Sequence, residues 1–142
     1  MPGPQEWRIG AHVLSFEPPD VLWIFYGGPL SLQEAVQVVG IHAQLGASQS
    51  FFVVSDMKDL GMPEPEVGRY ISEHIDSSVL RATIHFGARL AQKALARGIV
   101  LASQMSERGG LDDLSRVHFV DTKDDALELL VRLRANGVPP KR

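Results

Sequence analysis

The chain has 142 residues, of which 44% are hydrophobic and 22% are charged, and this balance predicts one compact domain with a core of its own. It contains no cysteine, which excludes disulfides, cysteine-ligated zinc and thiol catalysis. The formal net charge of -3 is opposite to the strongly basic character that general nucleic-acid binding requires, so we expect no nucleic-acid partner.

We expect no targeting segment in this sequence. Residues 1–7 lack the basic start and apolar run of a signal peptide, and the longest apolar runs fall far short of the roughly 20 residues of a membrane span. We therefore expect a cytoplasmic protein without an integral membrane span. Residues 1–6 and 136–142 are rich in proline, glycine and polar residues, which predicts flexible tails around a single domain at residues 7–135.

The N-terminal part of the chain predicts a β-hairpin followed by a helix. Residues 7–16 and 21–26 are rich in β-branched and aromatic side chains, and the four residues between them have turn chemistry. The second of these segments is apolar on both faces, which is typical of a strand inside a sheet that is covered on both sides. Ser31 and Glu34 have the spacing of a capping box, and this predicts a helix that runs to about Leu45.

The middle of the chain predicts a buried strand and an amphipathic helix. Residues 51–54 are wholly apolar and suit a central parallel strand, which ends at Ser55 and Asp56. A proline-containing loop follows, and then a helix with apolar residues at helical spacing. We expect its buried stripe to consist of Val67, Tyr70, Ile71, His74 and Ile75.

The C-terminal part predicts two further strands, at residues 82–86 and 117–120, and two further helices. The first helix, at about residues 89–105, is expected to turn Leu90 and Ala91 inward, and the second begins after Thr122. Strands that alternate with helices imply right-handed crossover connections. The predicted fold class is therefore α/β, with a mostly parallel mixed sheet of about five strands, an N-terminal β-hairpin and four helices.

Several segments together resemble one known family. The opening hairpin, "LSLQEAVQVV", "FFVVSDMKDLG", "PEVGRYISEHI" and "VHFVDTKDDALELL" resemble the SpoIIAA-like family of small domains, of the STAS/SEC14 type, over residues 7–133. The resemblance implies an α/β domain of the kind used in bacterial signalling. It also implies a protein partner, which would be either a different protein or a second copy of this chain in a homodimer.

The resemblance raises the question of a phosphorylation switch. Anti-sigma-factor antagonists with the STAS fold are phosphorylated on a serine or threonine just beyond the strand that ends in aspartate, but residues 56–66 here contain no hydroxyl residue. The usual phosphorylatable residue is therefore missing. Asp59, Glu64 and Glu66 place negative charge in that segment. They are either a permanent imitation of the phosphorylated form or ordinary charges of a solvated loop and helix N-terminus.

Candidate chemical groups are few and scattered. Asp56 stands at the carboxyl end of a buried strand, the edge where open α/β sheets bind ligands, although strand ends also use aspartate as a turn acceptor. The five histidines lie on five different predicted elements without metal-binding spacing, so we predict no metal and no cofactor. His85 and His118 would approach each other if their strands were neighbours. Arg89 is either a solvated surface side chain or an anion contact near the sheet edge.

Three functional hypotheses follow from these residues. The first is a non-enzymatic interaction or regulatory module, which docks a partner through the loop after the buried strand and through the next helix. Its candidate binding residues are Asp56, Lys58, Asp59, Glu64, Glu66, Tyr70 and His74. The alternative is a domain that binds a small apolar ligand or lipid between the sheet and its helices, as the SEC14-type likeness implies. The third is an enzyme that uses Asp56, although the sequence assigns no catalytic set.

Overall fold

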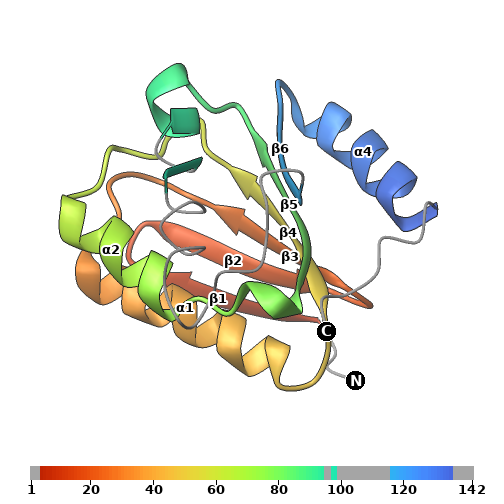
Figure 1. The fold of residues 1–142 in the computed structure, drawn as a ribbon, viewed down its shortest axis with the longest axis horizontal. Coiled ribbons are helices and arrows are strands. Elements are labelled where there is room, and N and C mark those ends of the chain that lie inside the picture. Colours follow the sequence, from red (N-terminus) through yellow and green to blue (C-terminus); the bar gives the residue numbers. More distant parts are fainter. Residues whose placement is uncertain (1–3, 95–96, 99–115, 136–142) are drawn as a thin grey trace.

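The computed structural model describes residues 4–94, 97–98 and 116–135 (Figure 1). The expected loop at residues 106–115, most of the expected third helix beyond residue 98 and the tail at residues 136–142 lie outside the described residues. The elements in chain order are β1 (Gln5–Ile9), β2 (His12–Glu17), β3 (Val21–Phe25), α1 (Leu32–Gly46), β4 (Phe51–Asp56), α2 (Pro65–His74), a short 3-10 helix (Ser77–Val79), β5 (Leu80–Phe86), β6 (Val117–Val120) and α4 (Lys123–Ala135). Residues 90–94 and 97–98 are also helical.

The strands form one mixed sheet that confirms the predicted α/β class. Within the described residues the sheet has six strands in the order β1-β2-β3-β4-β5-β6. The pairs β1–β2 and β2–β3 are antiparallel, whereas each pair from β3 to β6 is parallel. The parallel strands are joined by helical crossovers, as the alternation of strands and helices predicted.

The sheet has one strand more than the sequence suggested, because residues 7–16 form two strands. Ile9 pairs with His12 across a two-residue turn, and Gly10 in that turn has a φ of 60°. Glycine adopts positive φ without strain and is favoured at the first position of such hairpin turns. A Cβ at this position would also lie 2.0 Å from Oε2 of Glu34. The strand β1 begins at Gln5, inside the segment that was expected to be a tail.

Different helices cover the two faces of the sheet. Figure 1 shows α1 and α2 on one face and α4 on the other. Alternate residues of β3 and β4 point to opposite faces, so that Leu22 and Val53 belong to the core beneath α1 and α2, and Trp23 and Val54 to the core beneath α4. The prediction that the strand at residues 21–26 is covered on both sides is confirmed for β3, where Val21, Leu22, Trp23 and Ile24 are all buried.

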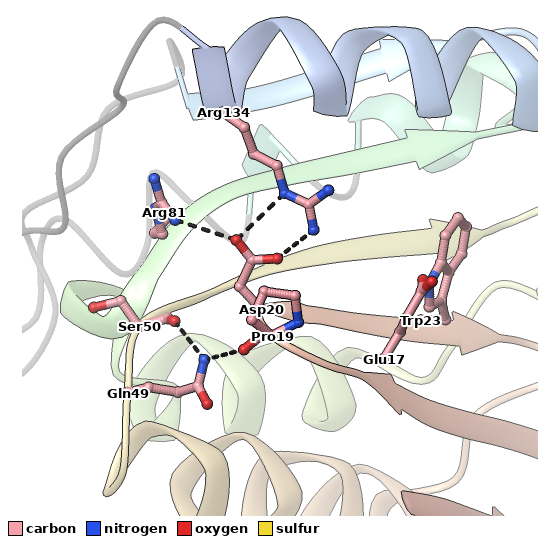
Figure 2. Close-up of polar contacts among 8 residues, drawn as sticks. All are labelled: Glu17, Pro19, Asp20, Trp23, Gln49, Ser50, Arg81 and Arg134. Carbon is pink, nitrogen blue, oxygen red and sulfur yellow. Dashed lines mark hydrogen bonds and ion pairs between the residues drawn. The ribbon is translucent and has the colours of Figure 1, made fainter. Parts of the chain in front are cut away.

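Side-chain contacts fix the ends of the helices. The predicted capping box of α1 is present, because the amide of Glu34 donates to Oγ of Ser31 at 3.1 Å and the amide of Ser31 donates to Oε1 of Glu34 at 2.9 Å. The C-terminal helix α4 is held by an ion pair, in which Arg134 donates to Asp20 in the β2–β3 turn. Asp20 also accepts from Nη1 of Arg81 at 3.3 Å (Figure 2). These ion pairs join α4 to the sheet.

No described helix has both the length and the apolar run that crossing a bilayer demands.

Candidate functional site

The aspartate at the end of β4 serves as a turn acceptor. Oδ1 of Asp56 accepts the backbone N–H of Lys58 at 3.0 Å, which closes a local turn as the chain leaves the strand. Two residues earlier, Val54 belongs to the core beneath α4, so the strand alternation directs Asp56 toward the α4 face. Ser55 points to the opposite face and is only 1% exposed, which keeps its hydroxyl out of reach of a kinase.

The charged candidates lie on the outside of the β4–α2 loop and of the first turn of α2. Lys58, Asp59, Glu64 and Glu66 are all exposed. Glu64 is the N-cap residue of α2 but makes no side-chain capping bond, and Glu66 lies in the first turn. Carboxylates in this position interact favourably with the positive end of the helix dipole. Among the described residues, no ion pair engages any of the four side chains.

The helix α2 presents two separate rows of side chains. Val67 is buried, and Ile71 packs against the same core one turn later. Tyr70 and His74 form the other row, with their rings stacked 4.0 Å apart, and Nδ1–H of His74 donates to the carbonyl oxygen of Tyr70 at 2.9 Å. His74 is exposed, so the prediction that it belongs to the buried stripe is wrong. Val67, Ile71 and Ile75 contribute the apolar side chains of the inward face, which also includes the buried Ser72.

A largely apolar cavity lies between this inward row and the sheet. Its volume is about 200 Å³. The floor comes from β3, β4 and β5 and the walls from α1 and α2. Lining residues include Ile24, Tyr26, Val38, His42, Val53, Ser55, Leu60, Val67, Gly68, Ile71, Thr83 and His85. Protein interiors rarely leave space larger than a water molecule, so a cavity of this size is a distinctive feature of the domain.

Small residues on facing elements account for the space. Gly68 on α2 has no side chain, and Ser55 and Thr83 are the small residues among those that β4 and β5 contribute to the lining. Larger apolar residues at these three positions would fill the volume that the cavity occupies. A glycine inside an amphipathic helix and a serine at the end of an apolar strand were visible in the sequence. Their juxtaposition was not, because it depends on strand register and helix orientation.

The β4–α2 loop covers one end of the cavity and is held there by the segment after β5. Nη1 and Nη2 of Arg89 donate to the carbonyl oxygens of Lys58 and Leu60 at 3.2 and 3.1 Å. Nε2 of Gln92 donates to the carbonyl oxygens of Met57 and Leu60 at 3.0 and 2.6 Å. Arg89, a candidate anion contact in the sequence, is therefore occupied by backbone carbonyls.

The orientation of this helical segment differs from the prediction. Gln92 is 1% exposed, whereas Leu90, which was expected to face the core, is 81% exposed, and Ala91 is exposed as well. A polar side chain takes the buried position because the carbonyl groups of the loop need donors once they are removed from water. Hydrophobic periodicity alone cannot signal such a requirement.

The titratable groups of the cavity are uncharged at neutral pH, apart from Arg116. Burial raises the pKa of Tyr26 to about 12 and lowers the pKa of His85 to about 4. Burial also lowers the pKa of His42, whose Nδ1–H donates to the carbonyl oxygen of Val38 at 2.9 Å. Nη1 of Arg116 donates to the carbonyl oxygen of Leu80 at 3.3 Å.

The histidines do not form a site together. The strands β5 and β6 are neighbours, but His85 pairs with Phe119 and His118 pairs with Ile84, so the two imidazoles lie on opposite faces of the sheet. Within residues 4–94, 97–98 and 116–135, no group of three or more histidine or acidic side chains could hold a metal ion.

Comparison with known proteins agrees with this architecture. No protein-family model matches the chain, and no curated protein matches it. A solved structure that is similar over 92% of this chain and 98% of its own is that of an uncharacterized protein of the DUF3478 family with a SpoIIAA-like fold from Shewanella loihica PV-4. The two share 15% sequence identity, with a TM-score of 0.50. The chain has a SpoIIAA-like fold, as the resemblance in its sequence implied.

Proposed function

We propose that this domain is a non-enzymatic binding module that takes up a small apolar molecule between its sheet and the helices α1 and α2. The observation that carries the proposal is the cavity of about 200 Å³ with its largely apolar lining. An apolar cavity of 150 Å³ inside a protein stays dry and binds benzene, so this one has room for a somewhat larger ligand. It is too small for a complete two-chain lipid.

The position of the cavity also supports binding. It lies beneath the β4–α2 loop, whose carbonyl groups are held by Arg89 and Gln92. A ligand that contacts Leu60 or Ile71 from inside would alter the same loop and helix that expose charged side chains to solvent. The domain would thereby report occupancy to the outside without performing chemistry.

Binding is tested by titrating 15N-labelled protein with p-xylene and following the backbone amide resonances. We expect saturable shifts that concentrate on the elements lining the cavity, which are α1, α2, β3, β4 and β5. The variant Ile71→Phe should abolish them, because the larger ring occupies the cavity, and should leave the protein as stable or more stable by up to about 1 kcal/mol. The matched control Leu127→Phe adds the same ring on the outer side of α4, where Leu127 is 39% exposed, and should bind like the wild type. Shifts that persist in Ile71→Phe would contradict the proposal.

A second candidate function is recognition of a protein partner through the charged surface of the β4–α2 loop. Its support is that Lys58, Asp59, Glu64 and Glu66 are exposed, with no ion pair to any described residue. In an affinity-capture experiment, the double variant Asp59→Lys, Glu66→Lys should fail to bind a protein partner that the wild type binds. The melting temperature of the variant should equal that of the wild type. Equal capture by both proteins would remove this candidate.

A further inference from the structure

The outer edge of β1 has no neighbouring strand among the described residues. In the order β1-β2-β3-β4-β5-β6 this strand comes first, so one side of its backbone is open. Such an edge presents N–H and C=O groups with which a strand of another molecule can pair. Trp7 and Ile9 turn toward the core beneath α1 and α2, whereas Glu6 and Arg8 are exposed on the opposite face of the sheet.

The hydrogen-bond pattern shows which backbone groups of β1 face this edge. The backbone groups of successive residues in a strand point alternately to its two sides. Asp20 and Tyr26, immediately before and after β3, both bond to β4 through backbone groups, at 2.7 and 3.4 Å, so the even-numbered residues of β3 turn toward β4 and the odd-numbered ones toward β2. The unbroken registers between β3, β2 and β1 carry this alternation across the sheet. They leave Glu6 and Arg8 with their N–H and C=O groups on the open side.

Charge selects one register for the pairing of two β1 strands. Two copies related by a two-fold axis at Trp7 place Glu6 of each chain opposite Arg8 of the other. A shift by two residues, the smallest that keeps the hydrogen-bonding alternation, opposes either Glu6 to Glu6 or Arg8 to Arg8. Opposite charges directly across an antiparallel pair stabilise it, and like charges destabilise it. The same two side chains therefore favour the register at Trp7 and disfavour its neighbours.

We propose that two copies of this chain associate in solution through β1, which pairs antiparallel with β1 of the second copy about Trp7. The backbone groups of Glu6 then exchange hydrogen bonds with those of Arg8 across the interface, and the symmetry repeats this exchange. The contact uses the same patch of both copies, so the assembly closes as a dimer. The inference does not depend on the proposed function, because β1 does not line the cavity.

The ion pair within one chain does not oppose this exchange of partners. Nη2 of Arg8 lies 3.3 Å from Oε2 of Glu6, and both side chains are exposed. Exposed pairs contribute little to stability, so Glu6 and Arg8 can take new partners at small cost. A single strand pair is a small interface, and we expect a dissociation constant in the micromolar range or weaker. At lower concentrations the chain is a monomer.

Charge reversal on the full chain tests the register by sedimentation equilibrium. Glu6→Arg and Arg8→Glu each place like charges across both symmetry-related contacts, and we expect either to raise the dissociation constant of the dimer about tenfold or more. The double variant Glu6→Arg, Arg8→Glu exchanges the two charges and should dimerise as the wild type does. Glu73→Arg makes the same charge change at an exposed position of α2 and is the control.

Mixing the two single variants gives a result that a folding defect does not imitate. One variant carries two basic residues at positions 6 and 8 and the other carries two acidic residues, so an equimolar mixture should form a heterodimer at least as tight as the wild-type dimer. A wild-type chain that remains monomeric at millimolar concentration, or a dimer that both single variants leave unchanged, would overturn the inference. So would a mixture that forms no heterodimer.

Discussion

Nε2 of Gln92 lies 2.6 Å from the carbonyl oxygen of Leu60, although 32 residues separate them in the chain. The same nitrogen reaches the carbonyl oxygen of Met57 at 3.0 Å. One buried amide therefore joins the segment after β5 to the loop after β4. Since Met57 and Leu60 both line the cavity, the geometry of the binding site depends on this side chain.

Replacing the amide should loosen this end of the cavity. In Gln92→Leu, the carbonyl groups of Met57 and Leu60 lose a donor, and we expect the free energy of unfolding to fall by about 1–3 kcal/mol. Hydrogen exchange at residues 57–61 should accelerate. The control Leu90→Gln changes a side chain that is 81% exposed on the same helical segment and should alter stability by less than about 0.5 kcal/mol. Equal protection of the loop in Gln92→Leu would show that Gln92 does not hold it.

The ion pairs of Asp20 should stabilise the attachment of α4. The carboxylate is 13% exposed and accepts from Arg81 and Arg134 (Figure 2). Asp20→Asn removes the negative charge that both arginines contact, and we expect chemical denaturation to show a loss of about 1–3 kcal/mol.

The exposed pair between Glu6 and Arg8 provides the comparison. Its side chains are 52% and 76% exposed, so Glu6→Gln should cost less than about 0.5 kcal/mol. If both substitutions cost the same, burial of the Asp20 cluster contributes nothing to stability.

The partly buried imidazole of His85 should make the fold sensitive to acid. Its pKa is about 4 in the folded protein and 6.5 in a solvated chain, so between these values the unfolded state binds more protons than the folded state. The contribution to stability is complete above pH 6.5 and is lost as the pH falls toward 4. This single group should lower stability by about 2 kcal/mol between pH 7 and pH 5.

Urea denaturation across pH 5–7 measures this dependence. His85→Phe should show a shallower decline than the wild type, whereas His74→Phe should keep the wild-type slope because His74 is exposed. Parallel curves for the wild type and His85→Phe would contradict the lowered pKa of this imidazole.

Local patterns in the sequence sufficed for most of the fold. Apolar runs marked β3 and β4, and the capping box of Ser31 and Glu34 marked the start of α1. The turn at Gly10 was missed, because a single glycine inside an apolar stretch is compatible with an unbroken strand as well as with a hairpin. The amino-acid composition of this segment does not distinguish an unbroken strand from a hairpin.

The cavity was less accessible from the sequence, for a physical reason. Empty volume arises where small side chains of different elements face one another. No local sequence pattern reveals that Ser55, Thr83 and Gly68 line the same cavity. The same holds for Gln92, whose burial follows from the needs of carbonyl groups in a distant loop. His74 was placed on the buried stripe because its spacing from Val67 and Ile71 fits a helical period, but the helix turns it outward and buries Ser72 instead.

The central claim is that the interior beneath α2 is an open apolar site, and a crystal structure under xenon pressure tests it most directly. Xenon enters dry apolar cavities of this size. The account predicts a xenon atom between β4 and α2, in contact with Val53 and Ile71. An interior without xenon, with the gas bound elsewhere or not at all, would contradict it.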